Sequence, residues 1–217
     1  MLVIPEIKIQ DGKNLILSIG KLSLTDGDSV YLHSDSPRGK TIFLHTLYWY
    51  LQKDKRTRDK FIKKGETIFF ALCQKKSKPR RSNRNVLLIE HDPVIIPNLT
   101  LNRNITLPFQ SLNIRLKNKI LEYLQLFNLN NKQFLPASCL SFTEMKIVEL
   151  IRAVMLLPEV IMIDDFDTSF HQTYHDQVHE ILDLMQKNGT ILIATGKSMN
   201  NSFSVQCTIN DKVVIKL

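Results

Sequence analysis

The chain has 217 residues, of which 43% are hydrophobic, which is enough for one large domain with a real core and argues against a disordered chain. Its three cysteines, Cys73, Cys139 and Cys207, lie far apart and form no C-x-x-C pair, which argues against a disulfide framework or a zinc site and for a reducing compartment. No leader-like segment and no run of about 18 apolar residues is visible. We therefore expect a cytoplasmic protein that is soluble or peripheral to a membrane.

The net charge of +8 is concentrated in one block of the sequence. Residues 53–84 contain 13 Lys and Arg against three acids, so the net charge of this block, 13 − 3 = +10, exceeds the +8 of the whole chain. Such a block suits an anionic membrane face or a nucleic acid, or is simply a solvated basic surface. Its aromatic residues fall in "ETIFFALC", which is typical of a strand, so they are not expected to stack on bases.

The elements expected in chain order alternate between strands and helices. Residues 2–24 show strand-like alternation broken by turn residues, which predicts an antiparallel sheet. Residues 29–33 form a short apolar strand, and helical spacing follows from Leu44 to Leu51. Continuous apolar runs typical of buried parallel strands occupy 86–89, 160–163 and 190–195. The sequence therefore predicts an α/β fold with a parallel sheet.

The loop after the strand at 29–33 resembles a phosphate loop. In "HSDSPRGKT", Gly39, Lys40 and Thr41 fit the end of the pattern G-x-x-x-x-G-K-[ST], in which backbone N–H groups and the Lys hold phosphates and the hydroxyl ligates Mg²⁺. Ser34 stands where the first Gly belongs. The end of the loop therefore predicts phosphate binding, and its beginning does not.

A carboxylate pair follows the apolar strand at 160–163. Asp164 and Asp165 come at the carboxyl end of this strand, where α/β folds bind ligands and where phosphate-loop proteins hold Mg²⁺ through an Asp. Upstream, Ser141 and Glu144 form an S-x-x-E capping box before an amphipathic helix. Two acids after a strand are often only a polar strand end, but together with Lys40 and Thr41 they predict a nucleotide site.

The stretch "LSFTEMKIVELIRAVMLLPEVIMIDDFDTSF" resembles the signature of ATP-binding subunits of ABC transporters, L-S-G-G-E-Q-Q-R-V-A-x-A-R-A-L-x-x-x-P, followed by the acidic strand of that family. The resemblance covers nearly the whole chain. It implies a single nucleotide-binding domain over 1–217, with a phosphate-loop core, an N-terminal antiparallel subdomain and an inserted helical subdomain at about 92–145. It also implies ATP and Mg as cofactors, with Gly39, Lys40, Thr41 and Ser141 binding ATP and with Thr41 and Asp164 holding Mg.

The segment "HDPVIIPNLTLNRNITLPF" is similar to the FtsE, LolD and MacB branch of the family, and we favour an FtsE-like, cell-division-linked subunit over a LolD-like one. This resemblance implies an integral membrane partner similar to FtsX, a homodimer of the chain and a peripheral position on the cytoplasmic face of the inner membrane. In the family the helical subdomain docks on the membrane partner. We expect Val94, Ile95, Ile96 and Leu99 to be exposed apolar contacts there, although ordinary core positions would show the same pattern.

Several residues depart from the family pattern. Pro37 removes an N–H donor from the phosphate loop, and Phe142 and Thr143 replace the paired glycines of the signature. His91 replaces the Gln that reaches the attacking water. Three further residues differ from the family pattern: Asp165 replaces the catalytic Glu, His171 replaces the D-loop Asp and Gly196 replaces the switch His.

These departures leave three readings open. The first is a degenerate subunit, or pseudo-ATPase, that keeps its membrane partner while nucleotide binding is weak or absent and hydrolysis is slow. The second is a divergent but active ATPase for lipoprotein release or efflux, in which Asp165 and His91 carry out catalysis. The third is a nucleic-acid-binding module that uses the basic block at 53–84, which the lack of interleaved aromatic residues disfavours.

Overall fold

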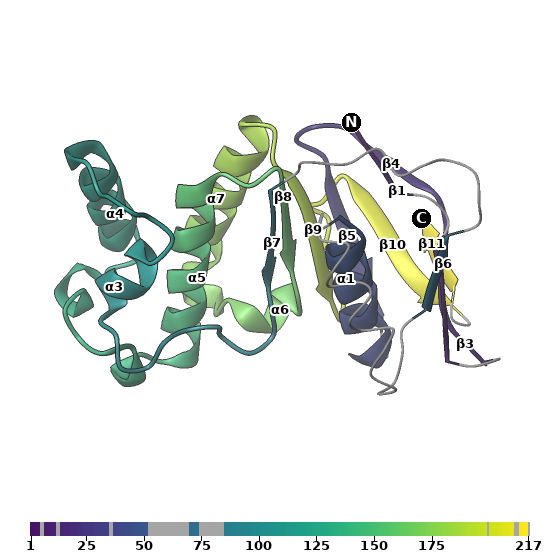
Figure 1. The fold of residues 1–217 in the computed structure, drawn as a ribbon, viewed down its shortest axis with the longest axis horizontal. Helices are drawn as coiled ribbons and strands as arrows, with labels where there is room; N and C mark the ends of the chain where they lie inside the picture. The colour runs from purple at the N-terminus through teal and green to yellow at the C-terminus, as the bar shows by residue number, and fades with distance from the viewer. Residues whose placement is uncertain are drawn as a thin grey trace.

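The computed structural model describes residues 1–4, 7–11, 14–34, 37–51, 70–73, 85–198, 200–210 and 213–216. Within these ranges the chain forms two sheets, with helices on both faces of the larger one (Figure 1). The strands are β1 (Leu2–Ile4), β2 (Ile7–Asp11), β3 (Asn14–Ile19), β4 (Leu22–Leu24), β5 (Ser29–His33), β6 (Phe70–Cys73), β7 (Val86–Ile89), β8 (Val160–Ile163), β9 (Ile191–Gly196), β10 (Val205–Asn210) and β11 (Val213–Lys216).

The larger sheet has nine strands in the order β6-β2-β3-β11-β10-β5-β9-β8-β7. The five strands from β10 to β7 run parallel to one another, whereas β10–β11, β2–β3 and β2–β6 pair antiparallel. The smaller sheet is the antiparallel pair β1–β4. This arrangement confirms the predicted α/β fold with a parallel sheet and an N-terminal antiparallel part.

The helices are α1 (Pro37–Leu51), α3 (Leu101–Thr106), α4 (Ile114–Leu126), α5 (Phe142–Leu156), α6 (Phe166–Ser169) and α7 (His175–Lys187), with short 3₁₀ turns η1 (Asn130–Lys132), η2 (Ala137–Cys139) and η3 (Gln172–Tyr174). Helices α3 and α4 lie at the end of the molecule beyond α5 (Figure 1). The predicted capping box is confirmed, because the Ser141 hydroxyl accepts from the Glu144 N–H and the Glu144 carboxylate accepts from the Ser141 N–H.

Alternate residues of the central strands face two different apolar cores. In β8, Val160 and Met162 join the core that contains the α1 residues Phe43, Leu44 and Leu47, whereas Ile161 and Ile163 join the core formed with α5 and α7. The pleat of a strand sends successive side chains to opposite faces, so a strand that is covered on both faces must be apolar throughout. This geometry explains why the continuous apolar runs in the sequence predicted β7, β8 and β9 within about one residue of their ends.

Two sequence predictions fall largely outside the described residues. Of the predicted strand in "ETIFFALC", β6 covers 70–73, and the rest lies outside the described residues. The same holds for nearly all of the basic block at 53–84. Among the described residues, no helix is long and apolar enough to cross a membrane.

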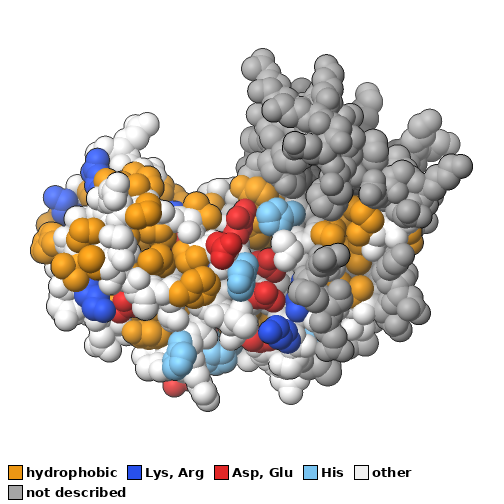
Figure 2. All heavy atoms as spheres, turned by 90° about the horizontal axis from the view of Figure 1, so that it is seen from below, with side chains coloured by type: hydrophobic (Ala, Val, Ile, Leu, Met, Phe, Trp, Pro, Cys, Tyr) orange, Lys and Arg blue, Asp and Glu red, His pale blue; other side chains and the backbone are white. Residues whose placement is uncertain are grey.

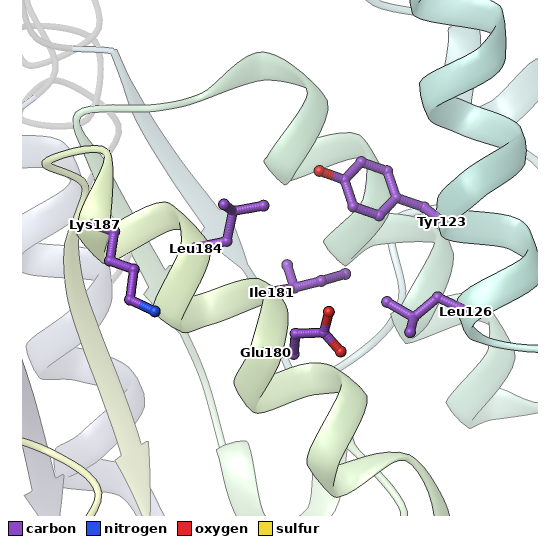
Figure 3. A pocket seen from close by; sticks show the side chains of 6 residues that line it. All are labelled: Tyr123, Leu126, Glu180, Ile181, Leu184 and Lys187. Carbon is purple, nitrogen blue, oxygen red and sulfur yellow. The ribbon is translucent and has the colours of Figure 1, made fainter.

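A groove of about 260 Å³ separates α4 from α7 (Figure 3). Tyr123 and Leu126 of α4 face Ile181 and Leu184 of α7, and Glu180 and Lys187 line its polar side. Burial, followed by the charge of Glu122, raises the pKa of Tyr123. The groove belongs to the helical half of the molecule, which is made of α3, α4, α5 and α7 (Figure 1). Its lining does not include Asp164 or Asp165.

A polar row on α5 fastens this helix to the segment that follows β7. The ammonium of Lys146 is fully buried, donates to the Glu90 carbonyl and lies 2.8 Å from a carboxylate oxygen of Glu149. The other oxygen of Glu149 accepts from the Val94 N–H at 2.8 Å, and the Arg152 guanidinium donates to the Val94 carbonyl at 3.2 Å. Residues 90–94, which include His91, are therefore held by three successive charged side chains of one helix face.

We predict that Lys146→Met destabilises the fold strongly, because it leaves the Glu149 carboxylate buried without its cation. The expected loss is about 3–5 kcal/mol, the usual cost of breaking a buried ion pair, which corresponds to a melting temperature lowered by roughly 10 °C. Thermal unfolding followed by circular dichroism measures this. The double variant K146M/E149L should regain most of the loss, and Lys119→Met on the exposed face of α4 serves as the control. A loss in K146M no larger than in the control would contradict the role of the pair.

An aromatic cluster with two histidines supports α6. Phe166 is fully buried and packs against Phe170, His175 and His179, with ring centroids 5.7–6.1 Å apart. Burial, followed by the charge of His175, lowers the pKa of His179, and Asp183 and Asp176 only partly offset this. His179 is therefore held in its neutral form more strongly in the folded chain than in the unfolded one.

This pKa shift predicts a pH dependence of stability. A base whose pKa is lower in the folded state contributes full stability above its unfolded pKa, about 6.5, and that contribution is lost as the pH falls toward the folded value. The melting temperature should therefore drop between pH 7.5 and pH 5.5, by about 2–4 °C for each kcal/mol lost. His179→Gln should reduce this drop, while His171→Gln at an exposed position should leave it unchanged. An unaltered pH profile in H179Q would refute the assignment.

Candidate functional site

The site forms at the carboxyl ends of β5, β8 and β9, where three loops meet. Helix α1 begins at Pro37, so this proline occupies the first helical position, which tolerates a missing N–H and suits its fixed φ. The missing donor is still one of those that a helix N-terminus directs toward an anion. Residues 35–36 lie outside the described residues.

Gly39 and Lys40 in the first turn of α1 are fixed by contacts below the loop. A Cβ atom on Gly39 would lie 2.7 Å from Cδ1 of Ile209 in β10, so the tip of the Ile209 side chain packs directly against this glycine. The Lys40 side chain is buried, and its ammonium donates to the Ser34 carbonyl at 2.9 Å. Lys40 therefore points back over the loop that precedes its own helix.

The carboxylate of Asp164 joins α1, β8 and β9. One oxygen accepts from the Thr41 hydroxyl at 2.8 Å, and the other accepts from the Thr195 hydroxyl at 2.7 Å. The Asp165 N–H also donates to Asp164, at 3.1 Å. A buried carboxylate must have its oxygens satisfied, and here the donors come from α1, from β9 and from the backbone of the next residue.

The next residue, Asp165, stands between two basic side chains. Its Oδ1 lies 3.7 Å from the Lys40 ammonium and its Oδ2 lies 3.6 Å from Nδ1 of His91. The backbone of Asp165 is left-handed, with φ 46° and ψ 55°, a conformation that is unfavourable for a residue with a side chain and persists only where the surroundings hold it. Figure 2 looks onto this side of the molecule, where acidic and histidine side chains gather next to an apolar region over the helical half.

The N-terminus of α5 approaches the same region through an aromatic ring. The Phe142 ring is 42% exposed, and its centroid lies 6.1 Å from that of His91. The Ser141 hydroxyl serves as the cap of α5. Glu144 pairs with Lys132 at 2.7 Å. Burial by itself raises the pKa of Glu144, but the hydrogen bonds from Lys132 and Ser141 and the charge of Lys132 together outweigh burial, so the pKa is lowered.

At the end of β9, Gly196 is surrounded by other side chains. A Cβ atom on this residue would lie 1.7 Å from the Tyr31 hydroxyl oxygen and 2.5 Å from Oδ2 of Asp167. Position 196 therefore has no room for any side chain while Tyr31 stays where it is. The Ser34 N–H donates to the Gly196 carbonyl at 3.3 Å, so the end of β9 directly borders the loop before α1.

The residues present fit part of an ATP and Mg site. A hydroxyl and a carboxylate at hydrogen-bond distance, Thr41 and Asp164, are the hard oxygen donors that Mg²⁺ takes. The Lys40 ammonium has no carboxylate closer than Asp165 at 3.7 Å among the described residues, so it has charge to offer a phosphate. The positions that the family resemblance places near the outer phosphate, Phe142 and Gly196, carry no polar side chain.

The structure brings together most of the residues singled out from the sequence. Lys40, Thr41, Asp164, Asp165 and His91 form one connected group, and Gly39 lies in the same turn as Lys40. The Ser141 hydroxyl bonds within its own helix instead. The sequence analysis missed Thr195, Tyr31 and Asp167, because their contacts depend on the registers of β9 with β5 and with β8, which no local motif encodes.

The match to a family model agrees with this geometry. Residues 17–168, more than half of the chain, match the model described as "ABC transporter". No curated protein matches the chain.

Solved structures resemble the chain along nearly its whole length. They include cbiO1 from Clostridium perfringens, part of the ABC transporter complex cbiONQ, at 13% identity and a TM-score of 0.65, covering 97% of this chain and 86% of that one. An ATP-binding subunit of an ABC transporter has 14% identity and a TM-score of 0.69, covering 98% and 90%. A putative ABC transporter ATP-binding protein from Pyrococcus furiosus has 15% identity and a TM-score of 0.65, covering 94% and 97%. At these identities the likeness establishes the fold, and the family match adds that the chain belongs to the ABC transporter family as an ATP-binding domain.

Proposed function

We propose that the chain is a degenerate, FtsE-like subunit that couples to an FtsX-like integral membrane partner in a cell-division complex on the cytoplasmic face of the membrane. In this proposal it acts as a homodimer and spans one nucleotide-binding domain over 1–217, with the helical subdomain at about 92–145. Nucleotide binding is weak or absent, and hydrolysis is slow. The branch assignment rests on the similarity of "HDPVIIPNLTLNRNITLPF" to that branch.

The observation that carries the degenerate character is the lack of space at Gly196. The family resemblance assigns this position to a histidine that contacts the outer phosphate, and here even a Cβ atom would overlap the Tyr31 hydroxyl. The packing around position 196 therefore excludes a histidine there, and a single substitution of Gly196 does not restore this phosphate contact. Phe142, a large ring at the N-terminus of α5, supports the same conclusion for the signature.

The remaining polar residues define what the site could still do. Lys40 and Gly39 would hold phosphates, Thr41 and Asp164 would hold Mg, and Ser141 of the second copy would approach the nucleotide. Mg bound there would neutralise phosphate charge. Asp165 and His91 would orient water, but Asp165 is one methylene shorter than the Glu it replaces, and a displacement of about 1 Å can cost on the order of 100-fold.

The helical half offers an apolar surface for the membrane partner. Val94 and Ile96 are 57% and 47% exposed, as expected for docking residues. Ile95 is partly buried against the core and Leu99 is half-buried, so two of the four expected contacts are only partly exposed. Phe134 and Leu135, which the sequence analysis did not select, are also exposed, and backbone hydrogen bonds connect 133–138 with the segment 97–102.

We predict that the chain, alone or with a co-expressed FtsX-like partner, releases phosphate from Mg-ATP at least about 100-fold more slowly than the roughly 1 s⁻¹ at the low end of ordinary enzymes. Calorimetry of Mg-ATP binding and a phosphate-release assay measure the two quantities separately. Lys40→Ala should abolish any residual binding, and Lys119→Ala at an exposed position on α4 is the control. Turnover near 1 s⁻¹ that disappears in K40A would favour the alternative, an active ATPase for lipoprotein release or efflux.

We also predict that Val94→Asp weakens association with the membrane partner by about 10-fold or more, since a charge in the apolar centre of an interface must be desolvated without a partner. Affinity capture of the detergent-solubilised FtsX-like partner on the immobilised chain measures the effect. Ile114→Asp, at another exposed apolar position on α4, should leave binding unchanged. Equal losses in both variants would argue against a docking surface at Val94.

A further inference from the structure

Tyr31 makes a buried polar contact that is not part of the group formed by Lys40, Thr41 and Asp164. It is fully buried in β5, and its hydroxyl donates to Oδ1 of Asp167 at 2.7 Å. Burial, followed by the hydrogen bond to Asp167, raises the pKa of Tyr31, so the phenol stays protonated as a donor. The second carboxylate oxygen of Asp167 accepts from the Lys197 N–H at 3.0 Å.

These two hydrogen bonds connect three segments that are far apart in sequence. Tyr31 lies in the strand before the phosphate loop, Asp167 lies in the first turn of α6, and Lys197 directly follows β9. In the register of the sheet, Tyr31 pairs with Ala194, two residues before Gly196. The tyrosine ring therefore reaches along the strand end and brings its hydroxyl into the space beside Gly196.

Aromatic packing fixes the position of the Tyr31 ring. Its centroid lies 4.8 Å from that of Phe203, and Phe203 in turn makes an edge contact with Phe166 at 5.7 Å. Phe166 belongs to the same turn of α6 as Asp167. Because rings in such contacts are packed at core density, the hydroxyl has little freedom to move away from Asp167.

The loop that carries Asp165 is consequently held on both sides. On one side, Thr41 and Thr195 hold Asp164. On the other side, Tyr31 and the Lys197 N–H hold Asp167. All of these donors belong to the chain itself.

We propose that Tyr31 is a positioning residue that fixes the loop 164–167 without nucleotide. Its hydroxyl occupies the space that a side chain at position 196 would need in order to contact a bound phosphate. The inference rests on the proposed function, because it explains how the chain keeps an ordered site loop when nucleotide binding is weak or absent. It predicts that this loop is equally ordered with and without Mg-ATP.

Hydrogen exchange of the full-length chain, read by mass spectrometry over peptides that contain 164–170 and 197–203, tests the proposal. In the wild type these peptides should exchange slowly, and 5 mM Mg-ATP should change their rates by less than about twofold. Tyr31→Phe removes only the hydroxyl and should accelerate exchange of both peptides by about 10-fold, as expected for the loss of one hydrogen bond to a charged group. Tyr123→Phe, which removes a hydroxyl between α4 and α7, should leave both peptides unchanged.

A second pair of variants tests the steric part. Gly196→Ala should lower the melting temperature, and Tyr31→Leu, which shortens the side chain beside it, should make the Gly196→Ala substitution less costly when both are present. This non-additivity distinguishes a shared space from two independent losses. Additive losses would overturn the steric argument.

The proposal fails if the loop peptides of the wild type exchange quickly and become protected by Mg-ATP, or if Tyr31→Phe leaves them unchanged. These outcomes are separate from those of the functional proposal. Unchanged exchange in Y31F with no phosphate release would remove the role of Tyr31 and leave the degenerate subunit in place. Slow exchange that depends on Tyr31, combined with rapid Lys40-dependent turnover, would retain the positioning role and remove the degenerate reading.

Discussion

The structure depends on how the Asp164 carboxylate is satisfied. This group is buried at the end of β8, and it accepts from Thr41 on α1, from Thr195 on β9 and from the N–H of Asp165. Removing any one donor leaves a buried charge less well compensated, which is costly in a low-dielectric interior. The Asp164 carboxylate, which could hold Mg beside a phosphate, therefore also fixes the relative positions of α1, β8 and β9 when no ligand is bound.

The elements next to this carboxylate are connected by further side-chain contacts. A side chain at Gly196 would overlap the Tyr31 hydroxyl, and Asp167 accepts the hydrogen bond that this hydroxyl donates. On the other side, Lys146, Glu149 and Arg152 hold the segment that carries His91. These contacts connect α5 with the loop after β7, and connect β5 and the end of β9 with α6.

The sequence predicted the fold well because the signals were local and periodic. The apolar runs at 86–89 and 160–163 fall on β7 and β8, and the S-x-x-E pattern marks the start of α5. The connected group of Lys40, Thr41, Asp164 and Asp165 was also accessible, because its motifs lie at strand ends that a parallel sheet must bring together. The Tyr31–Asp167 contact was not accessible, since it joins residues 136 positions apart through a strand register. The exposure of Ile95 and Leu99 was misjudged for a related reason, because an irregular segment has no period from which its buried face could be read.

A ligand can shift a conformational equilibrium only through a difference in affinity between the two conformations. In a chain whose site loop is already held by Tyr31 and Lys197 on one side and by Thr41 and Thr195 on the other, the loop offers ATP little further order to select. A nucleotide bound at Lys40 would then add binding energy without changing the loop, and the helical half would present Val94 and Ile96 to a membrane partner in the same way with and without nucleotide. In the function proposed here, the lack of space at Gly196 and the Tyr31–Asp167 hydrogen bond are thus two sides of one arrangement, in which the chain itself supplies the order of this segment.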